Sequence, residues 1–262
     1  MAIGRGKALV YAIVAALAGG VAYVCGVRSD AGQRAEDAVL RAAEFSTDPA
    51  VPLSLVSPAN VVIALGVIGI IAWVFRGFVR MVWILLFSGA ALVASQLLKD
   101  RWLDRPTFDE VLTDNTFPSG HMVVFGVLVI ATLWAVPAGA RGVLALVGAV
   151  LLGVVSWELL AYAWHRPSDL LGAQALCVLV FSIAALFRVG RRGRGPGRAA
   201  RGLDVVAGAM LTIAGFALVI GGAAVVAAGM SNSNDALLLS GSQLALVGTS
   251  AFVARAGLAL GR

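Results

Sequence analysis

Two histidines are the residues of this 262-residue chain best suited to acid–base or nucleophilic chemistry near neutral pH. They are His121 and His165, and each stands at the end of a long apolar run. Asp169 follows His165 by four residues, close enough to hold one ring nitrogen by a hydrogen bond. That bond would fix the imidazole tautomer and leave the other nitrogen free to attack. The spacing therefore predicts an oriented histidine nucleophile at position 165.

The residues around His121 are typical of an anion site. Ser119 and Gly120 stand at the predicted start of a helix, where free N–H groups and the positive end of the helix dipole attract anions. Gly120 lets an anion approach the backbone closely because it has no side chain. Lys99 and Arg105 add positive charge, and arginine grips phosphate through two parallel hydrogen bonds. Together these residues favour phosphoryl transfer through a phosphohistidine.

No metal or organic cofactor is expected for this chemistry. The sequence has no acidic cluster typical of a metal site, and two histidines alone make a poor zinc site. The two cysteines, Cys25 and Cys177, lie inside apolar runs. They are predicted to be buried thiols, because a disulfide framework needs several cysteines in exposed segments.

The elements that must position these residues are predicted to be membrane-spanning helices. Hydrophobic residues make up 60% of the chain, charged residues only 13%, and the mean hydropathy is +0.93. A spanning helix needs about 20 mostly apolar residues, because the hydrocarbon core is about 30 Å thick. Trp102, Trp157 and Trp164 are predicted to lie at the membrane interface. We predict spans at about 8–27, 59–75, 81–98, 119–136, 142–164, 168–187, 204–229 and 236–254.

The positive charges predict the orientation of the chain in a cell membrane. The net charge is +6, but the basic residues stand in short connections between apolar runs, which favours orientation signals over a nucleic-acid surface. With Arg5 and Lys7 in the cytoplasm, the basic connections at 76–80, 137–141 and 188–201 and the C-terminus are also cytoplasmic. The histidines then lie on the extracytoplasmic side. The first apolar run is longer than a signal-peptide core, so we interpret it as a retained span.

The predicted fold is all-α, a polytopic membrane helix bundle. A stretch rich in glycine and arginine at 188–202 is expected to be a basic cytoplasmic linker, whose arginines either bind anionic lipid headgroups or only set the topology. It separates a six-span unit at 1–187 from a two-span hairpin at 203–262. The segment 31–45 is amphipathic and either lies on the membrane surface or covers the outer end of the bundle. Its apolar face holds Ala35, Ala38, Val39 and Ala42.

The three polar segments together resemble the signature of the type 2 phosphatidic acid phosphatase family, the lipid phosphate phosphatases. That signature reads K-x6-RP, then PSGH, then SR-x5-H-x3-D. Its counterparts here run from Lys99 to Pro106, from Pro118 to His121, and from His165 to Asp169. The resemblance covers about 99–169 by motif and implies that 1–187 is a six-helix phosphatase-like unit.

The resemblance also implies a role for each matching residue. His165 would attack phosphorus, Asp169 would orient it, and His121 would protonate the leaving group. The residues that would hold the phosphate are Lys99, Arg105, Ser119 and Gly120.

One departure from the family pattern lies in the first segment. Five residues, not six, separate Lys99 from Arg105. In a helix, one residue fewer turns a side chain by about 100°. Arg101 is therefore predicted to share the role of Lys99.

A second departure lies before His165, where the family's Ser-Arg pair falls on Glu158 and Leu159. One phosphate-binding arginine is thus missing, and Arg166 is predicted to compensate for it. A carboxylate facing a phosphate would repel it unless it were paired or protonated. Glu158 is predicted either to take part in catalysis or to pair with Arg101 or Arg105 as a structural group.

The expected function is a metal-independent lipid phosphate phosphatase on the extracytoplasmic face. A polyprenyl phosphate or diphosphate is the preferred substrate, with phosphatidate and phosphatidylglycerol phosphate left open. Two alternatives remain. One is a lipid phosphotransferase that uses the same His165 intermediate. The other, prompted by Leu159 and the extra helix pair, is a catalytically weak lipid-phosphate binding or assembly protein.

Overall fold

The computed structural model describes residues 4–108, 114–187 and 197–261, and all regular structure within these ranges is helical. The shorter elements are α2 (Asp30–Arg41), the 3-10 turn Leu53–Leu55, and the π-helical turns Tyr23–Val27 and Leu98–Trp102, which continue α1 and α4. The longer helices are α1 (Arg5–Ala22), α3 (Pro58–Arg76), α4 (Phe78–Leu97), α5 (Gly120–Ala135), α6 (Ala138–Ala161), α7 (Pro167–Phe187), α8 (Arg198–Ser231) and α9 (Asp235–Leu260).

Seven of these helices are long and apolar enough to cross a membrane: α1, α3, α4, α6, α7, α8 and α9. The multi-pass membrane bundle predicted from composition is thereby confirmed in its coarse form. The fourth predicted span, 119–136, forms α5, which has only 16 residues and falls short of the spanning length. It ends at Ala135 because Pro137, two residues on, cannot continue a helix. Most of α5 is buried, including Met122 and Trp134, so it lies inside the bundle.

Short polar residues start the helices that position the candidate site. Ser57 accepts a hydrogen bond from the N–H of Asn60 and caps α3, with Pro58 at the first helical position. Ser119 caps α5 in the same way, accepting the N–H of Met122. Helices α3 and α5 thus both begin at the same end of the bundle.

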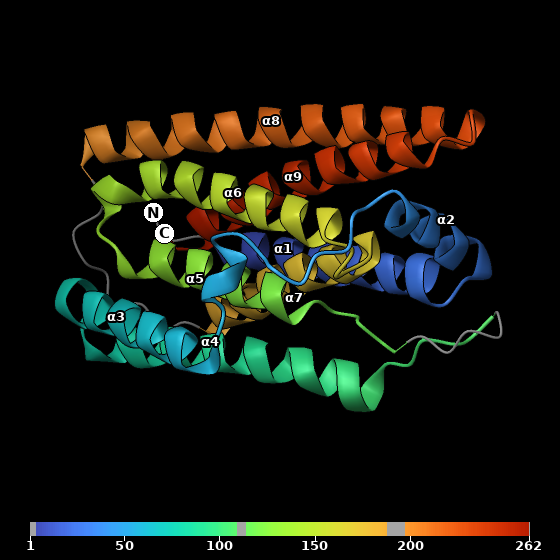
Figure 1. Cartoon of the computed structure of the whole chain (residues 1–262). Coiled ribbons are helices and arrows are strands. Elements are labelled where there is room, and N and C mark those ends of the chain that lie inside the picture. The colour runs from blue at the N-terminus through green and yellow to red at the C-terminus, as the bar shows by residue number, and fades with distance from the viewer. Residues whose placement is uncertain (1–3, 109–113, 188–196, 262) are drawn as a thin grey trace.

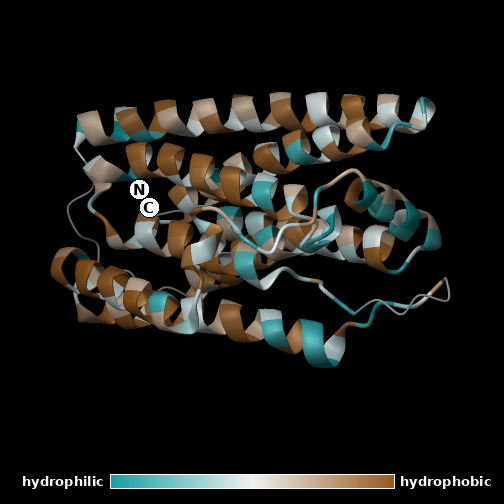
Figure 2. Ribbon diagram, in the orientation of Figure 1, coloured by the Kyte–Doolittle hydropathy of each residue, from teal (hydrophilic) through white to brown (hydrophobic). Residues whose placement is uncertain are grey.

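The helices form three groups in Figure 1, which places α8 on one flank and the α3–α4 pair on the other. Between them lie α5, α6, α7 and α9, whose residues supply most of the buried core. Figure 2 shows apolar residues along the length of the outer helices and polar residues gathered at the end that carries α2. The outward apolar surface is that expected of helices in contact with lipid.

The predicted linker at 188–202 is only partly described, since 188–196 lie outside the described ranges. The prediction is wrong at its end, because α8 already begins at Arg198. The residues Arg198 to Arg201 include two alanines, and alanine and arginine both favour helix. The helix therefore starts about six residues before the predicted span at 204.

The last helix is joined to the preceding bundle by a buried polar network. The side-chain amide of Gln174 on α7 donates to Ser156 of α6 at 3.2 Å and to Ser250 of α9 at 3.0 Å. The two serine hydroxyls lie 3.1 Å apart.

Between α8 and α9 the backbones approach closely, and a Cβ on Gly222 would stand 2.5 Å from the nitrogen of Ala245. Small residues of this kind let membrane helices pack tightly.

The amphipathic segment predicted at 31–45 forms α2. This helix covers one end of the bundle, which was one of the two predicted positions. Ala38 and Val39 are buried against Leu238 of α9. Ala35 is exposed, against the prediction, because the helix instead turns Glu36 inward. The carboxylate of Glu36 accepts hydrogen bonds there from Ser168 of α7.

Candidate functional site

A cavity of about 620 Å³ lies at the end of the bundle where α3 and α5 begin and where α4 ends. Four residues predicted from the sequence line it: Lys99, Gly120, His121 and His165. The other lining residues are Val56, Ser57, Pro58, Val61, Leu92, Ser95, Gln96, Val123 and Val124. Residues far apart in the chain thus share one site.

The two imidazoles face this cavity from different elements. His121 is the second residue of α5, and His165 lies in the short connection between α6 and α7. Their ring centroids are 6.2 Å apart. Attack needs an approach of about 3–3.5 Å, and proton transfer needs a hydrogen bond of about 2.6–3.2 Å. A group of the size of phosphate between the rings therefore lies within reach of both.

Asp169 lies within hydrogen-bond distance of His165, the contact that the four-residue spacing predicted. Its Oδ2 lies 3.4 Å from Nδ1 of His165 and also accepts the hydroxyl of Thr116 at 2.6 Å and the N–H of Arg166 at 3.0 Å. Its Oδ1 accepts a hydrogen bond from Arg105 at 3.1 Å. The carboxylate is fully buried and fixed from several sides. With Nδ1 donating to Asp169, the Nε2 of a neutral His165 carries the free lone pair.

The start of α5 reaches the cavity through Gly120. Ser119, predicted to hold phosphate, is instead fully buried and does not line the cavity. Its hydroxyl caps α5, and its N–H donates to the carbonyl of Asp169 at 3.0 Å. Ser119 thereby fastens the start of α5 to the start of α7. The positive end of the α5 dipole faces the cavity at Gly120 and His121.

The predicted cations take different positions. Lys99 lines the cavity, while Arg101 is exposed and lies outside its lining. Arg105 is buried behind Asp169, with its Nη1 4.0 Å from Glu36. Burial lowers the pKa of its guanidinium. Its Nε and Nη1 have no hydrogen-bond partner among the residues that the structure describes.

Arg166, the predicted replacement for the missing arginine, points away from the cavity. Its guanidinium binds Asp37 of α2, with Nη2 and Nε at 3.1 Å and 3.3 Å from the same oxygen. Leu159 is fully buried in the core. Glu158 does not line the cavity, and no ion pair joins it to Arg101 or Arg105 within the described ranges. The predicted structural pairing of Glu158 is therefore wrong.

Glu36 is a site-associated residue that the sequence did not reveal. Its Oε1 accepts the N–H of Ser168 at 2.7 Å, and its Oε2 accepts the Ser168 hydroxyl at 3.0 Å. Burial and, to a lesser degree, the negative charge of Asp169 raise its pKa to about 7. The sequence could have indicated its burial, because Glu36 precedes Val39 by three residues and so lies on the same, buried face of the helix.

The three tryptophans predicted at the membrane interface differ in their exposure. Trp102 and Trp157 are exposed, as a place at the membrane interface requires. Trp164 instead packs beside His121, with ring centroids 5.5 Å apart, and its N–H donates to the carbonyl of Ser46 at 2.7 Å. Trp164 therefore limits the movement of the His121 ring.

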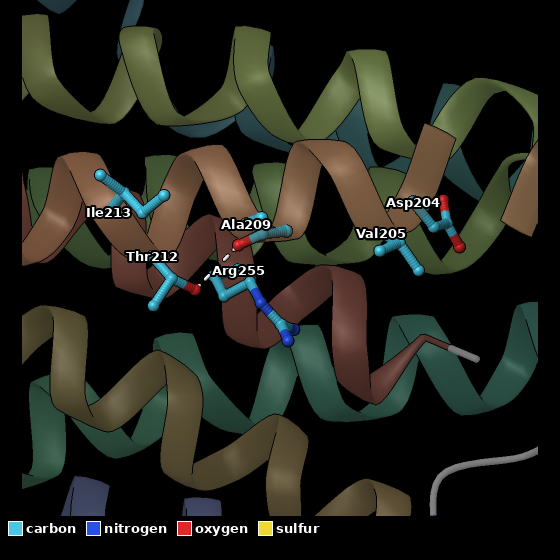
Figure 3. Close-up of a pocket in the computed structure, with 7 residues that line it drawn as sticks. Asp204, Val205, Ala209, Thr212, Ile213 and Arg255 are labelled. Carbon is cyan, nitrogen blue, oxygen red and sulfur yellow. Dashed lines mark hydrogen bonds between the residues drawn. The ribbon is translucent and has the colours of Figure 1, made fainter. Parts of the chain in front are cut away.

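A second, smaller cavity of about 380 Å³ lies between α8 and α9 (Figure 3). Arg255 and Asp204 line it together with Thr212. None of the predicted site residues lies there. Throughout the described ranges, no three His, Cys, Asp or Glu side chains come together as a metal site would require.

Comparison with protein-family models, curated proteins and solved structures gives no match. The function must be argued from the site itself, because a helical bundle alone specifies no chemistry.

Proposed function

We propose that this protein is a divergent member of the type 2 phosphatidic acid phosphatase family that hydrolyses the phosphate group of a membrane lipid. The observation that carries the proposal is the convergence of His121 and His165 on one cavity, 6.2 Å apart, with Asp169 at Nδ1 of His165. An oriented imidazole beside a second imidazole supplies both a nucleophile and a proton donor.

The first step transfers the phosphoryl group to the protein. Nε2 of His165 attacks phosphorus, and the bond from phosphorus to the lipid oxygen breaks. His121, protonated, gives its proton to that oxygen, and the lipid leaves as an alcohol. Lys99 and the positive end of α5 offset the charge of the phosphoryl oxygens.

The second step returns the protein to its starting state. His121, now neutral, takes a proton from a water molecule, and the water oxygen attacks phosphorus. The bond from phosphorus to Nε2 of His165 breaks, and inorganic phosphate leaves. Asp169 holds the His165 ring in place during both steps and stabilises its positive charge.

The distribution of polarity in the cavity supports an amphiphilic substrate. The polar residues stand near the helix ends, while Val61, Leu92, Val123 and Val124 lie about one helical turn deeper. A phosphate headgroup at the rim would place its hydrocarbon tail against these apolar side chains. We propose membrane lipids as partners and a polyprenyl phosphate or diphosphate as the preferred substrate.

The proposed location is the extracytoplasmic face of a cell membrane. The two ends of the described chain lie at the opposite end of the bundle from α2 (Figure 1). Arg80 donates there to the carbonyl of Gly261 at 3.4 Å. Arg76 donates to the carbonyl of Val136 at the same end. Because basic connections favour the cytoplasm, the cavity would face outward.

A catalytically weak lipid-phosphate binding protein is the second candidate. The observation that favours it is the scarcity of cations in the cavity, whose lining includes Lys99 but neither Arg105 nor Arg166. Each charge-assisted contact to phosphate contributes about 1.5–3 kcal/mol. The missing contacts would slow turnover while still permitting binding.

One experiment separates these functions. The purified protein in detergent is offered a panel of lipid phosphates, and free phosphate is measured for the wild type, for His165→Ala, and for Ser182→Ala as a control. Ser182 is buried on α7 and does not line the cavity. Hydrolysis requires release that His165→Ala abolishes and Ser182→Ala retains. Lipid-phosphate binding without phosphate release, with the same affinity in His165→Ala as in the wild type, supports the second candidate. Transfer of labelled phosphate to an added lipid alcohol supports a phosphotransferase.

A further inference from the structure

The cavity extends past the two histidines to a second group of polar residues. Ser57 at the start of α3, and Ser95 and Gln96 near the end of α4, line this part. Helix α3 has 19 residues, and the positive end of its dipole lies at this wall because Ser57 and Pro58 both contribute to the lining. A second helix start therefore faces the cavity, besides that of α5.

Ser95 provides an independent indication of a ligand. Its side chain is only 1% exposed, and its hydroxyl oxygen has no hydrogen-bond partner among the residues that the structure describes. Buried hydroxyls in proteins are nearly always hydrogen-bonded. A ligand oxygen in the cavity would supply the missing acceptor.

The neighbouring residues fit an anion in this place. Gln96 is exposed to the cavity and carries an amide N–H donor, and Lys99 follows Ser95 by one helical turn. No carboxylate occurs in the cavity lining that the structure describes. Lys99 is thus placed to contact two anionic groups, one beside the histidines and one beside Ser95.

We infer that the cavity holds two phosphate groups in line, so that its substrate class is a lipid diphosphate rather than a monophosphate. The inference rests on the proposed function. The terminal phosphate lies between His121 and His165, and the inner phosphate lies against Ser95, Gln96 and the start of α3. The tail then follows the apolar residues one turn deeper, Val61 and Leu92.

The second subsite acts on the leaving group. Nε2 of His165 attacks the terminal phosphorus, and the bond from that phosphorus to the bridging oxygen breaks. The bridging oxygen takes the electron pair of the broken bond and a proton from His121, and the lipid monophosphate leaves. Water then releases inorganic phosphate from His165. Donors from Ser95 and Gln96 stabilise the negative charge that develops on the leaving phosphate, so they contribute to catalysis and not only to binding.

The test compares farnesyl diphosphate with farnesyl monophosphate in detergent, since both carry the same tail. We measure the ratio of their kcat/KM values in the wild type, in Ser95→Ala and in Gln96→Leu. Each variant is expected to lower this ratio about 10-fold, the effect of one hydrogen bond to a charged group. Ser88→Ala is the matched control, because Ser88 is also fully buried on α4 without a described partner but does not line the cavity. Its ratio is expected to stay at the wild-type value.

The outcomes separate this inference from the proposed function. A ratio that neither Ser95→Ala nor Gln96→Leu changes would overturn the second subsite and leave the phosphatase intact. If the wild type releases phosphate from neither substrate, the proposed function fails, and binding of inorganic pyrophosphate and of inorganic phosphate is measured instead. A loss of pyrophosphate affinity in Ser95→Ala greater than the loss of phosphate affinity would still support two anion positions. Equal losses would overturn them.

Discussion

The carboxylate of Glu36 is buried under α2, and burial together with the charge of Asp169 raises its pKa from 4.5 to about 7. The folded protein therefore keeps this proton at pH values where the unfolded chain has lost it. The contribution to stability is fully present below pH 4.5, falls as the pH rises, and is lost above about pH 7.

The perturbation is Glu36→Gln, which removes the titration and resembles the protonated carboxyl in shape. A pKa rise of this size corresponds to about 3 kcal/mol in total, of which about 2–3 kcal/mol falls between pH 5 and pH 8. The variant is thus expected to gain that amount of stability relative to the wild type across this interval. Any constant difference in hydrogen bonding to Ser168 cancels, because only the change with pH is compared.

The assay is unfolding in detergent at a series of pH values, followed by tryptophan fluorescence. Glu44→Gln is the matched control, because Glu44 is an exposed carboxylate just beyond α2. Its difference from the wild type is expected to stay flat. Parallel stability curves for the wild type and Glu36→Gln would refute the reasoning, since they would mean that Glu36 titrates alike in both states.

Two further predictions concern the orientation of His165 and the packing of the last two helices. Asp169→Asn is expected to lower kcat for phosphate release by about 10²–10⁴, because an amide no longer fixes the His165 tautomer; a rate within threefold of the wild type would contradict this role. Gly222→Ala is expected to destabilise the protein by about 1–3 kcal/mol, because the added Cβ would meet backbone of α9 at 2.5 Å. Gly221→Ala is its control, since a Cβ there meets nothing within 4 Å. Thermal unfolding measures both, and equal midpoints would contradict the close approach of α8 and α9.

The fold was largely predictable because apolar run length reports directly on spanning helices. The apolar run at 119–136 does form a helix, α5, but not a spanning one. Its apolar residues are buried in the core and do not face lipid, and Pro137 ends the helix early. The start of α8 at Arg198 was missed because glycine and arginine in the predicted linker concealed a helical end. Local composition does not reveal where such a helix begins.

The site was predictable where chain topology alone decides position. Alternating spans bring Lys99, Gly120, His121 and His165 to one end of the bundle, and the spacing to Asp169 suffices for the hydrogen bond. The directions of Arg105 and Arg166 were not predictable, because they follow from ion pairs with Asp169 and Asp37 that only tertiary contacts decide. Asp169 lies 64 residues from Arg105 along the chain, and Asp37 lies 129 residues from Arg166.

The buried polar network of Gln174, Ser156 and Ser250 has a consequence for protein engineering. Deleting the last two helices would remove the Ser250 hydroxyl and leave the Gln174 amide with one acceptor fewer in an apolar interior. It would also expose to lipid the faces of α6 and α7 that now carry Ser156 and Gln174. A shortened protein without α8 and α9 therefore requires apolar residues of similar volume in place of Ser156 and Gln174.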